Sequence, residues 1–112
     1  MKLTLKNKLF LLELWIKYKN FDLFELIKIK SNDDKIYPFM DIGESRLGDA
    51  FLMKNPDKNE VYFYCGKGFT THSVITAPIQ EVRIYKNCCV ITTRNSKYRL
   101  TEGKIKHEKQ KT

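Results

Sequence analysis

The feature that most constrains the fold is a series of short segments in which apolar and polar residues alternate. In residues 60–65, Val61, Phe63 and Cys65 alternate with Tyr62 and Tyr64. A period of two is typical of a β-strand with one buried face. Two further segments alternate in the same way, Val82 and Ile84 with Arg83 and Tyr85, and Tyr98 and Leu100 with Lys97 and Arg99. Much of the chain is therefore expected to be β-structure with one face buried.

Turn-forming residues separate these segments at a spacing of roughly ten residues, which is typical of a small antiparallel sandwich or barrel. The turn signals are Gly43, Gly48, Asn55-Pro56-Asp57, Gly66-Lys67-Gly68, Lys86-Asn87 and Arg94-Asn95-Ser96. The predicted strands are 36–42, 49–54, 60–65, 73–76 continuing into 79–85, 88–93 and 97–101. Pro78 interrupts one of them and predicts a bend there.

The N-terminal region has a different period. Residues 4–19 predict a helix that Thr4 caps, because Leu5, Leu9, Leu12 and Ile16 follow the spacing of one helical stripe. In residues 23–30, Ile27 and Ile29 alternate with their neighbours, which favours a strand that ends in the turn-rich segment 31–34.

The predicted helix carries more apolar surface than one stripe needs. Phe10, Leu11, Leu14, Trp15 and Tyr18 add to the stripe that would pack on the β-region. Such a helix is either well buried or pressed against a partner. A homodimer through the N-terminal helix is therefore an open expectation beside simple packing on the sheet.

A chain of 112 residues with 42% apolar residues predicts one domain with a real core. We expect residues 1–102 to form it, with the helix at 4–19 and β-structure over 23–101. Residues 103–112 are polar and basic and predict a disordered tail. The fold class is therefore α+β: an N-terminal helix packed on a small, mostly antiparallel barrel or sheet.

The net charge of +8 is unevenly distributed. Residues 1–30 carry seven lysines against three acids, whereas residues 31–60 carry four bases against seven acids. Much of the remaining positive charge falls in the last 16 residues, which carry six bases against two acids. A surface divided in this way suits a macromolecular partner without singling out nucleic acid.

Three cysteines, Cys65, Cys88 and Cys89, predict reduced thiols in a cytosol. Cys88 and Cys89 would point to opposite faces of a strand and so not pair with each other, while a pair involving Cys65 stays open. The apolar stretch from Leu9 to Ile16 is interrupted by Glu13 and is far shorter than the ~20 residues of a membrane span. We expect no membrane contact.

The sequence predicts a protein that is not an enzyme and binds no metal or cofactor. Cys65 and His72 match no local nucleophile signature, and the histidines and cysteines lack paired zinc-ligand spacing. Gly66-Lys67-Gly68 lacks the P-loop pattern and indicates a hairpin turn.

The candidate binding residues follow from strand parity. The apolar residues of the three alternating segments are expected to face the core: Val61, Phe63, Val82, Ile84, Tyr98 and Leu100. Their neighbours on the same strands then face outward, and two turn residues lie nearby. Together these are the candidate binding residues: Tyr62, Tyr64, Lys67, Arg83, Tyr85, Arg94, Lys97 and Arg99. Tyrosines among cations can hold single-stranded nucleic acid or anchor a protein interface. An acidic loop offers a second partner contact through Asp33, Asp34, Asp41, Glu44 and Asp49.

The segments THSVITAPIQEVRIY and CVITTRNSKYRL, within residues 71–101, resemble small β-rich accessory proteins of bacteria and phages. Some proteins of that kind are anti-CRISPR-like inhibitors of host defence systems. The resemblance implies an inhibitor from a phage or mobile element that occludes a surface of a host defence nucleoprotein, with a host protein or nucleoprotein complex as partner. Two alternatives stay open: a small β-barrel protein that binds nucleic acid directly, and a protein that sequesters a nucleotide.

Overall fold

The computed structural model describes residues 3–31, 40–68 and 72–103, which form one helix and one seven-stranded sheet. The elements in chain order are α1 (Leu5–Lys19), β1 (Phe24–Ser31), β2 (Ser45–Asn55), β3 (Glu60–Gly66), β4 (Val74–Ile75), β5 (Ile79–Ile84), β6 (Cys89–Thr93) and β7 (Ser96–Glu102). Every pairing between them is antiparallel, in the order β4-β3-β2-β1-β7-β6-β5. The α+β class is confirmed, and the sheet is not closed into a barrel.

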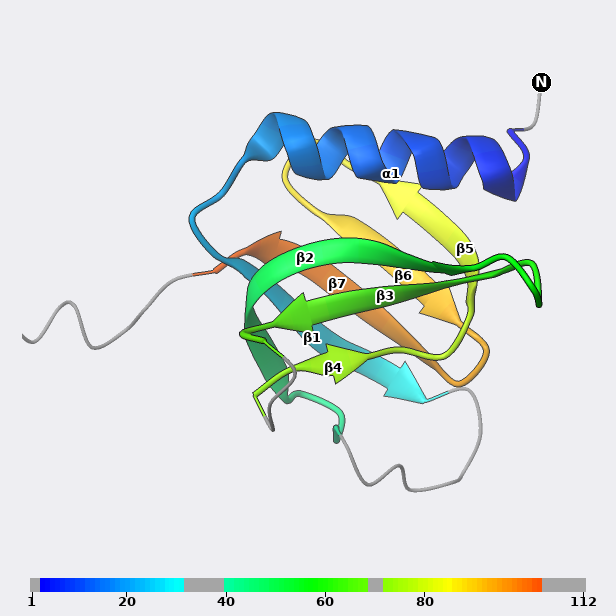
Figure 1. The fold of residues 1–112 in the computed structure, drawn as a ribbon. Helices are drawn as coiled ribbons and strands as arrows, with labels where there is room; N and C mark the ends of the chain where they lie inside the picture. Colours follow the sequence, from blue (N-terminus) through cyan, green and yellow to red (C-terminus); the bar gives the residue numbers. More distant parts are fainter. Residues whose placement is uncertain (1–2, 32–39, 69–71, 104–112) are drawn as a thin grey trace, which may run out of the picture.

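Helix α1 lies across one face of the sheet, above β2 and β5 (Figure 1). Its start is fixed by Thr4, whose hydroxyl oxygen accepts a hydrogen bond from the Asn7 backbone N–H at 3.1 Å. It ends at Asn20, which adopts a left-handed conformation with φ of 45°. The predicted helix and its cap are confirmed.

Three polar contacts between α1 and the strands fix its direction across the sheet. The Lys8 ammonium lies 2.7 Å from the Glu81 carboxylate of β5, and the Lys54 ammonium of β2 lies 3.4 Å from Glu13. The indole N–H of Trp15 donates to the Tyr85 carbonyl at 3.1 Å. Between these contacts Leu12 is completely buried, in a core cluster with side chains from the sheet.

The core occupies the face of the sheet that α1 covers. Alternate residues of the strands point into it, as the two-residue period predicts. Its fully buried apolar members are Leu12, Leu26, Phe63, Cys65, Cys89, Ile91 and Leu100. Ile84 is a correction to the predicted core, because it ends the edge strand β5 and is 37% exposed.

The predicted strand 36–42 is wrong in the part that the structure describes. Residues 40–42 are not a strand: the chain turns at Asp41, whose carbonyl accepts from the Glu44 N–H at 3.0 Å. The rest of the predicted strand 36–42 lies in 32–39, outside the described residues, as does all but Gly103 of the predicted tail. Pro78, in contrast, lies as expected in the link between β4 and β5.

Gly48 is not in a turn, as the sequence suggested, but inside the long strand β2. Its φ is +147°, and a Cβ at this position would lie 2.0 Å from the Gly66 carbonyl oxygen of β3. Glycine is needed here because the two strands approach each other too closely for a side chain.

Substitution of Gly48 by alanine should therefore destabilise the protein more than substitution of a glycine with free space around it. Gly43 is the matched control, because its φ is +91° and a Cβ added to it would have no atom within 4 Å. We expect Gly48→Ala to lower the free energy of unfolding by about 2 kcal/mol more than Gly43→Ala in urea titrations. An equal decrease in the free energy of unfolding for both variants would show that the close approach to Gly66 does not affect stability.

The three cysteines are free thiols. Burial raises the pKa of both Cys65 and Cys89 to about 12, whereas the side chain of Cys88 is half-buried. A raised pKa means that the fold favours the neutral thiols. Their contribution to stability is complete below the ordinary thiol pKa of about 8.5 and is lost as the pH rises toward 12.

Iodoacetamide at a pH of about 8, just below the ordinary thiol pKa, should consequently modify Cys88 in the folded protein. Cys65 and Cys89 should stay unmodified until urea unfolds the chain. Peptide mass spectrometry after timed labelling measures the three rates separately. Labelling of Cys65 in the native protein at the rate of Cys88 would contradict the burial of this thiol.

No helix among the described residues is long and apolar enough to cross a membrane.

Candidate functional site: a cationic sheet face

The face of the sheet opposite α1 carries side chains from β5, β6, β7 and β1 in register. Arg83 of β5 pairs with Val90 of β6, Val90 with Arg99 of β7, and Arg99 with Ile27 of β1. Paired residues of antiparallel strands project to the same face. These four side chains therefore form one row across four strands, with an arginine at two positions.

A second row lies beside the first. Thr92 of β6 pairs with Lys97 of β7, Lys97 pairs with Lys30 of β1, and Glu81 of β5 pairs with Thr92 at the edge of the row. From usual strand spacings, the Cα atoms of Lys30, Arg83, Lys97 and Arg99 lie within about 16 Å of one another. We refer to the two rows without Glu81 as the cationic face: Ile27, Lys30, Arg83, Val90, Thr92, Lys97 and Arg99.

Lys30 reaches this face because β1 contains a bulge. The register between β1 and β7 shifts between Lys28 and Lys30, so Ile29 is an extra residue. In an unbroken strand Lys30 would share the face of Lys28, whose side chain is buried and whose ammonium donates to the Met40 carbonyl at 3.0 Å. The bulge turns Lys30 outward instead, where it is exposed.

The four cations of the cationic face differ from other basic residues of the protein in their surroundings. Within the described ranges, Lys30, Arg83, Lys97 and Arg99 form no ion pair. By contrast, Lys8, Arg46, Lys54 and Arg94 each lie within 4 Å of a carboxylate. The four cations thus have no carboxylate within ion-pair distance in the described ranges. The charge of Arg83 nevertheless acts on Glu81, where it helps to lower the pKa of the carboxyl.

Two acidic residues, Glu81 and Glu25, border the cationic face. Glu81 of the edge strand β5 bonds to Lys8 of α1, and this hydrogen bond, together with one from the Val82 N–H, lowers the pKa of its carboxyl. Glu25 lies beside the first row, two residues from Ile27 along β1, because it pairs with Thr101, whereas Asp49 lies farther away and pairs with Gly66 of β3. The outer side of the sheet therefore carries acidic residues beside the four cations.

Two of the tyrosines predicted to lie among these cations, Tyr62 and Tyr64, are elsewhere, on β3. Tyr64 points outward by parity but is only 2% exposed, which corrects its expected role as an open stacking surface. Its ring stacks on Phe51 of β2 with centroids 4.5 Å apart, and its hydroxyl donates to the Gly68 carbonyl. Tyr62 on the same strand donates to the Glu60 carboxylate at 2.7 Å, which raises the pKa of its phenol.

The other predicted binding residues fall into three places. Tyr85, 51% exposed, follows β5 at the end of the cationic face near Arg83. Arg94 lies in the turn between β6 and β7, and its guanidinium is 2.9 Å from the Glu60 carboxylate. Lys67 follows β3 and lies away from the cationic face. Arg83, Lys97 and Arg99 are therefore the predicted residues that the sheet brings together.

The predicted acidic contact is divided as well. Asp33 and Asp34 lie outside the described residues, and Asp49 is exposed on β2. Glu44 accepts a hydrogen bond from the Asp41 N–H at 2.9 Å and lies 3.3 Å from the Arg46 guanidinium. These two contacts, the backbone one first, lower the pKa of the Glu44 carboxyl. Asp41 and Glu44 thus form a hydrogen-bonded turn.

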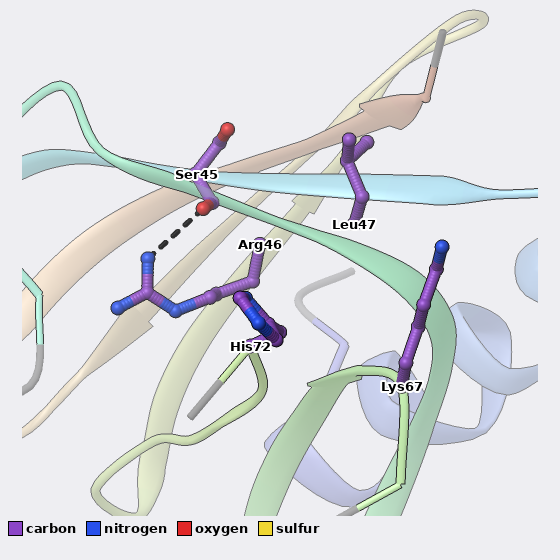
Figure 2. Close-up of a pocket in the computed structure, with 5 residues that line it drawn as sticks. All are labelled: Ser45, Arg46, Leu47, Lys67 and His72. Carbon is purple, nitrogen blue, oxygen red and sulfur yellow. Dashed lines mark hydrogen bonds between the residues drawn. The ribbon is translucent and has the colours of Figure 1, made fainter. Parts of the chain in front are cut away.

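An open pocket of about 570 Å³ lies at the start of β2, lined by Ser45, Arg46, Leu47, Lys67 and His72. Such a pocket could in principle hold the phosphate of a nucleotide. Figure 2 shows that the Arg46 side chain extends toward the Ser45 carbonyl, which it reaches at 3.0 Å, while Lys67 points away from it. Arg46 and Lys67 therefore do not point to one common position, as two residues that bind the same phosphate would. The cationic face is the better supported binding site.

Among the described residues, no three histidine, cysteine, aspartate or glutamate side chains lie close enough together to hold a metal ion. No family model matches this sequence, and no match was found among curated proteins or solved structures.

Sequence reasoning missed Ile27, Lys30, Val90 and Thr92 as members of the surface. Parity within one strand assigns faces but does not say which strands are neighbours, and it fails after a bulge. The alternation of residues 26–30 runs unbroken through Ile29, so it does not mark the bulge and assigns Lys30 to the face of Lys28.

Proposed function

We propose that this protein is a non-enzymatic inhibitor that acts in the bacterial cytoplasm by occupying a surface of a host defence nucleoprotein. The cationic face is the docking surface in this proposal. The observation that carries it is the gathering of four cations, none of them ion-paired among the described residues, on one open side of the sheet. Such a surface attracts phosphates and carboxylates over a distance and favours fast association.

The composition of the face favours contacts with charged groups over contacts with bases. Between Arg83, Lys97 and Arg99 lie the aliphatic Val90 and the hydroxyl of Thr92, and no aromatic ring belongs to the rows. Single-stranded nucleic acid is usually held by rings on which bases stack. The proposal therefore places acidic or phosphate-rich parts of a nucleoprotein, and not unpaired bases, against this face.

Charge reversal tests the proposal. We expect the triple variant R83E/K97E/R99E to lose at least about tenfold in affinity for the target complex, because three of four attractive charges become repulsive. The variant K6E/K17E/K58E is the matched control: it makes the same change in net charge at exposed positions outside the cationic face. Both should keep the wild-type far-UV spectrum.

The assay uses purified CRISPR effectors loaded with guide RNA, and measures both their capture by the protein and their binding of target DNA. Inhibition by the wild type and the control, but not by the triple variant, would support the proposal. Failure to bind or inhibit any such complex would overturn it.

Direct binding of nucleic acid is the second candidate, and the unpaired cations also favour it. If the four side chains neutralise four phosphates of a duplex, the logarithm of the affinity should fall with the logarithm of salt concentration with a slope of about −3.6. Fluorescence anisotropy with labelled single and double strands at about 50–200 mM salt measures this slope. A strong salt-dependent affinity for free duplex, equal to that for the loaded effector, would favour this candidate over the inhibitor.

A further inference from the structure

The side of α1 that faces away from the sheet is unusually apolar for a solvent-facing surface. Tyr18 is 87% exposed, Phe10 61% and Leu11 39%, whereas Leu12 on the opposite side is completely buried. Large apolar groups that lie together on a surface mark interaction sites more often than isolated ones do. The packing of α1 on the sheet accounts for the Leu12 side of the helix and leaves these residues without a role.

The exposed residues lie in one line along the helix, together with the half-buried Leu14. Asn7, Phe10, Leu11, Leu14 and Tyr18 follow spacings of three and four, which places them on one stripe. We call these five residues the outer stripe. The nearby charged residues Lys6, Glu13 and Lys17 project to one flank of it, at about 100° per residue around the helix. The outer stripe itself therefore contains no charge.

We propose that two copies of this protein associate through their outer stripes, with the two α1 helices antiparallel. In this arrangement Leu11 of each copy lies opposite Leu14 of the other, so the centre of the contact is apolar. The ends are complementary as well, because Asn7 of each copy then lies opposite Tyr18 of the other. The Tyr18 hydroxyl can donate to the Asn7 side-chain oxygen, and twofold symmetry forms this bond twice.

The properties of the outer stripe favour a second copy over a charged partner. An acidic or basic partner would find no opposite charge in the stripe, whereas a second copy presents an equally uncharged stripe. Asn7 and Tyr18 are about 16 Å apart along the axis, so the two polar contacts bracket an apolar centre of matching length. A parallel arrangement would instead place Asn7 against Asn7 and Tyr18 against Tyr18 and would lose this match.

The pairing is compatible with the rest of the molecule. Since α1 packs on the core side of the sheet, its outer stripe and the cationic face lie on different elements of the fold. One helix pair is a small interface, so we expect a dissociation constant in about the micromolar range. Association of two copies in this way does not depend on the proposed function.

Sedimentation velocity on the full chain between about 5 and 500 µM, a range that brackets micromolar affinity, tests the association. The wild type should shift from monomer to dimer over this range, and L11D/L14D should stay monomeric with an unchanged far-UV spectrum. A wild type that is monomeric at the highest concentration would overturn the proposal. So would a monomer that binds vesicles containing anionic lipid through Phe10 and Tyr18, because a membrane would then be the occupant of the stripe.

Charge pairs test the antiparallel register. In N7K/Y18K the lysines of the two copies face each other, and we expect at least about a tenfold weaker dimer. In N7E/Y18K each glutamate faces a lysine of the other copy, and dimerisation should recover to near the wild-type level. In a parallel pair, N7E/Y18K would bring like charges together at both ends and would stay monomeric. Failure of N7E/Y18K to dimerise would therefore overturn the proposed antiparallel register.

Discussion

The burial of Leu12 of α1 against the core side of the sheet is the contact on which the rest of the structure depends. The sheet is open at β4 and β5, so its apolar side needs a cover to exclude water. Helix α1 supplies this cover across β2 and β5 and is held by Lys8–Glu81, Glu13–Lys54 and Trp15–Tyr85 contacts. Because α1 takes one side of the sheet, the other side is left for polar residues and for partners.

The packing of α1 on only one side of the sheet explains the two candidate surfaces. On the open side, strand register aligns Arg83, Arg99 and Lys97, and the bulge at Ile29 adds Lys30. On the outer side of α1, the apolar residues that packing on the sheet does not use remain exposed. The two surfaces lie on different elements, the outer stripe on α1 and the cationic face on β5, β6, β7 and β1.

Much of the fold could be predicted because it depends on local pattern. The helix with its Thr4 cap, strand β1 and the alternation in β3, β5 and β7 follow from periods of 3.6 and two. The candidate site was predictable only in part. Arg83, Lys97 and Arg99 were expected to face outward and do so, but Tyr64 is covered by Phe51, which lies on a strand that alternation alone could not pair with β3.

The sequence by itself determined the α+β class, the side of each regular strand that meets the core, and the excess of apolar residues on the helix, because these depend on residues close in the chain. The tertiary structure decided which strands are neighbours, whether Tyr64 is open, why Gly48 lies within a strand, and where Lys30 points. The physical reason is that cross-strand register, close backbone approach and a bulge join residues far apart in the chain. These contacts brought four cations to one face and made it the candidate binding surface.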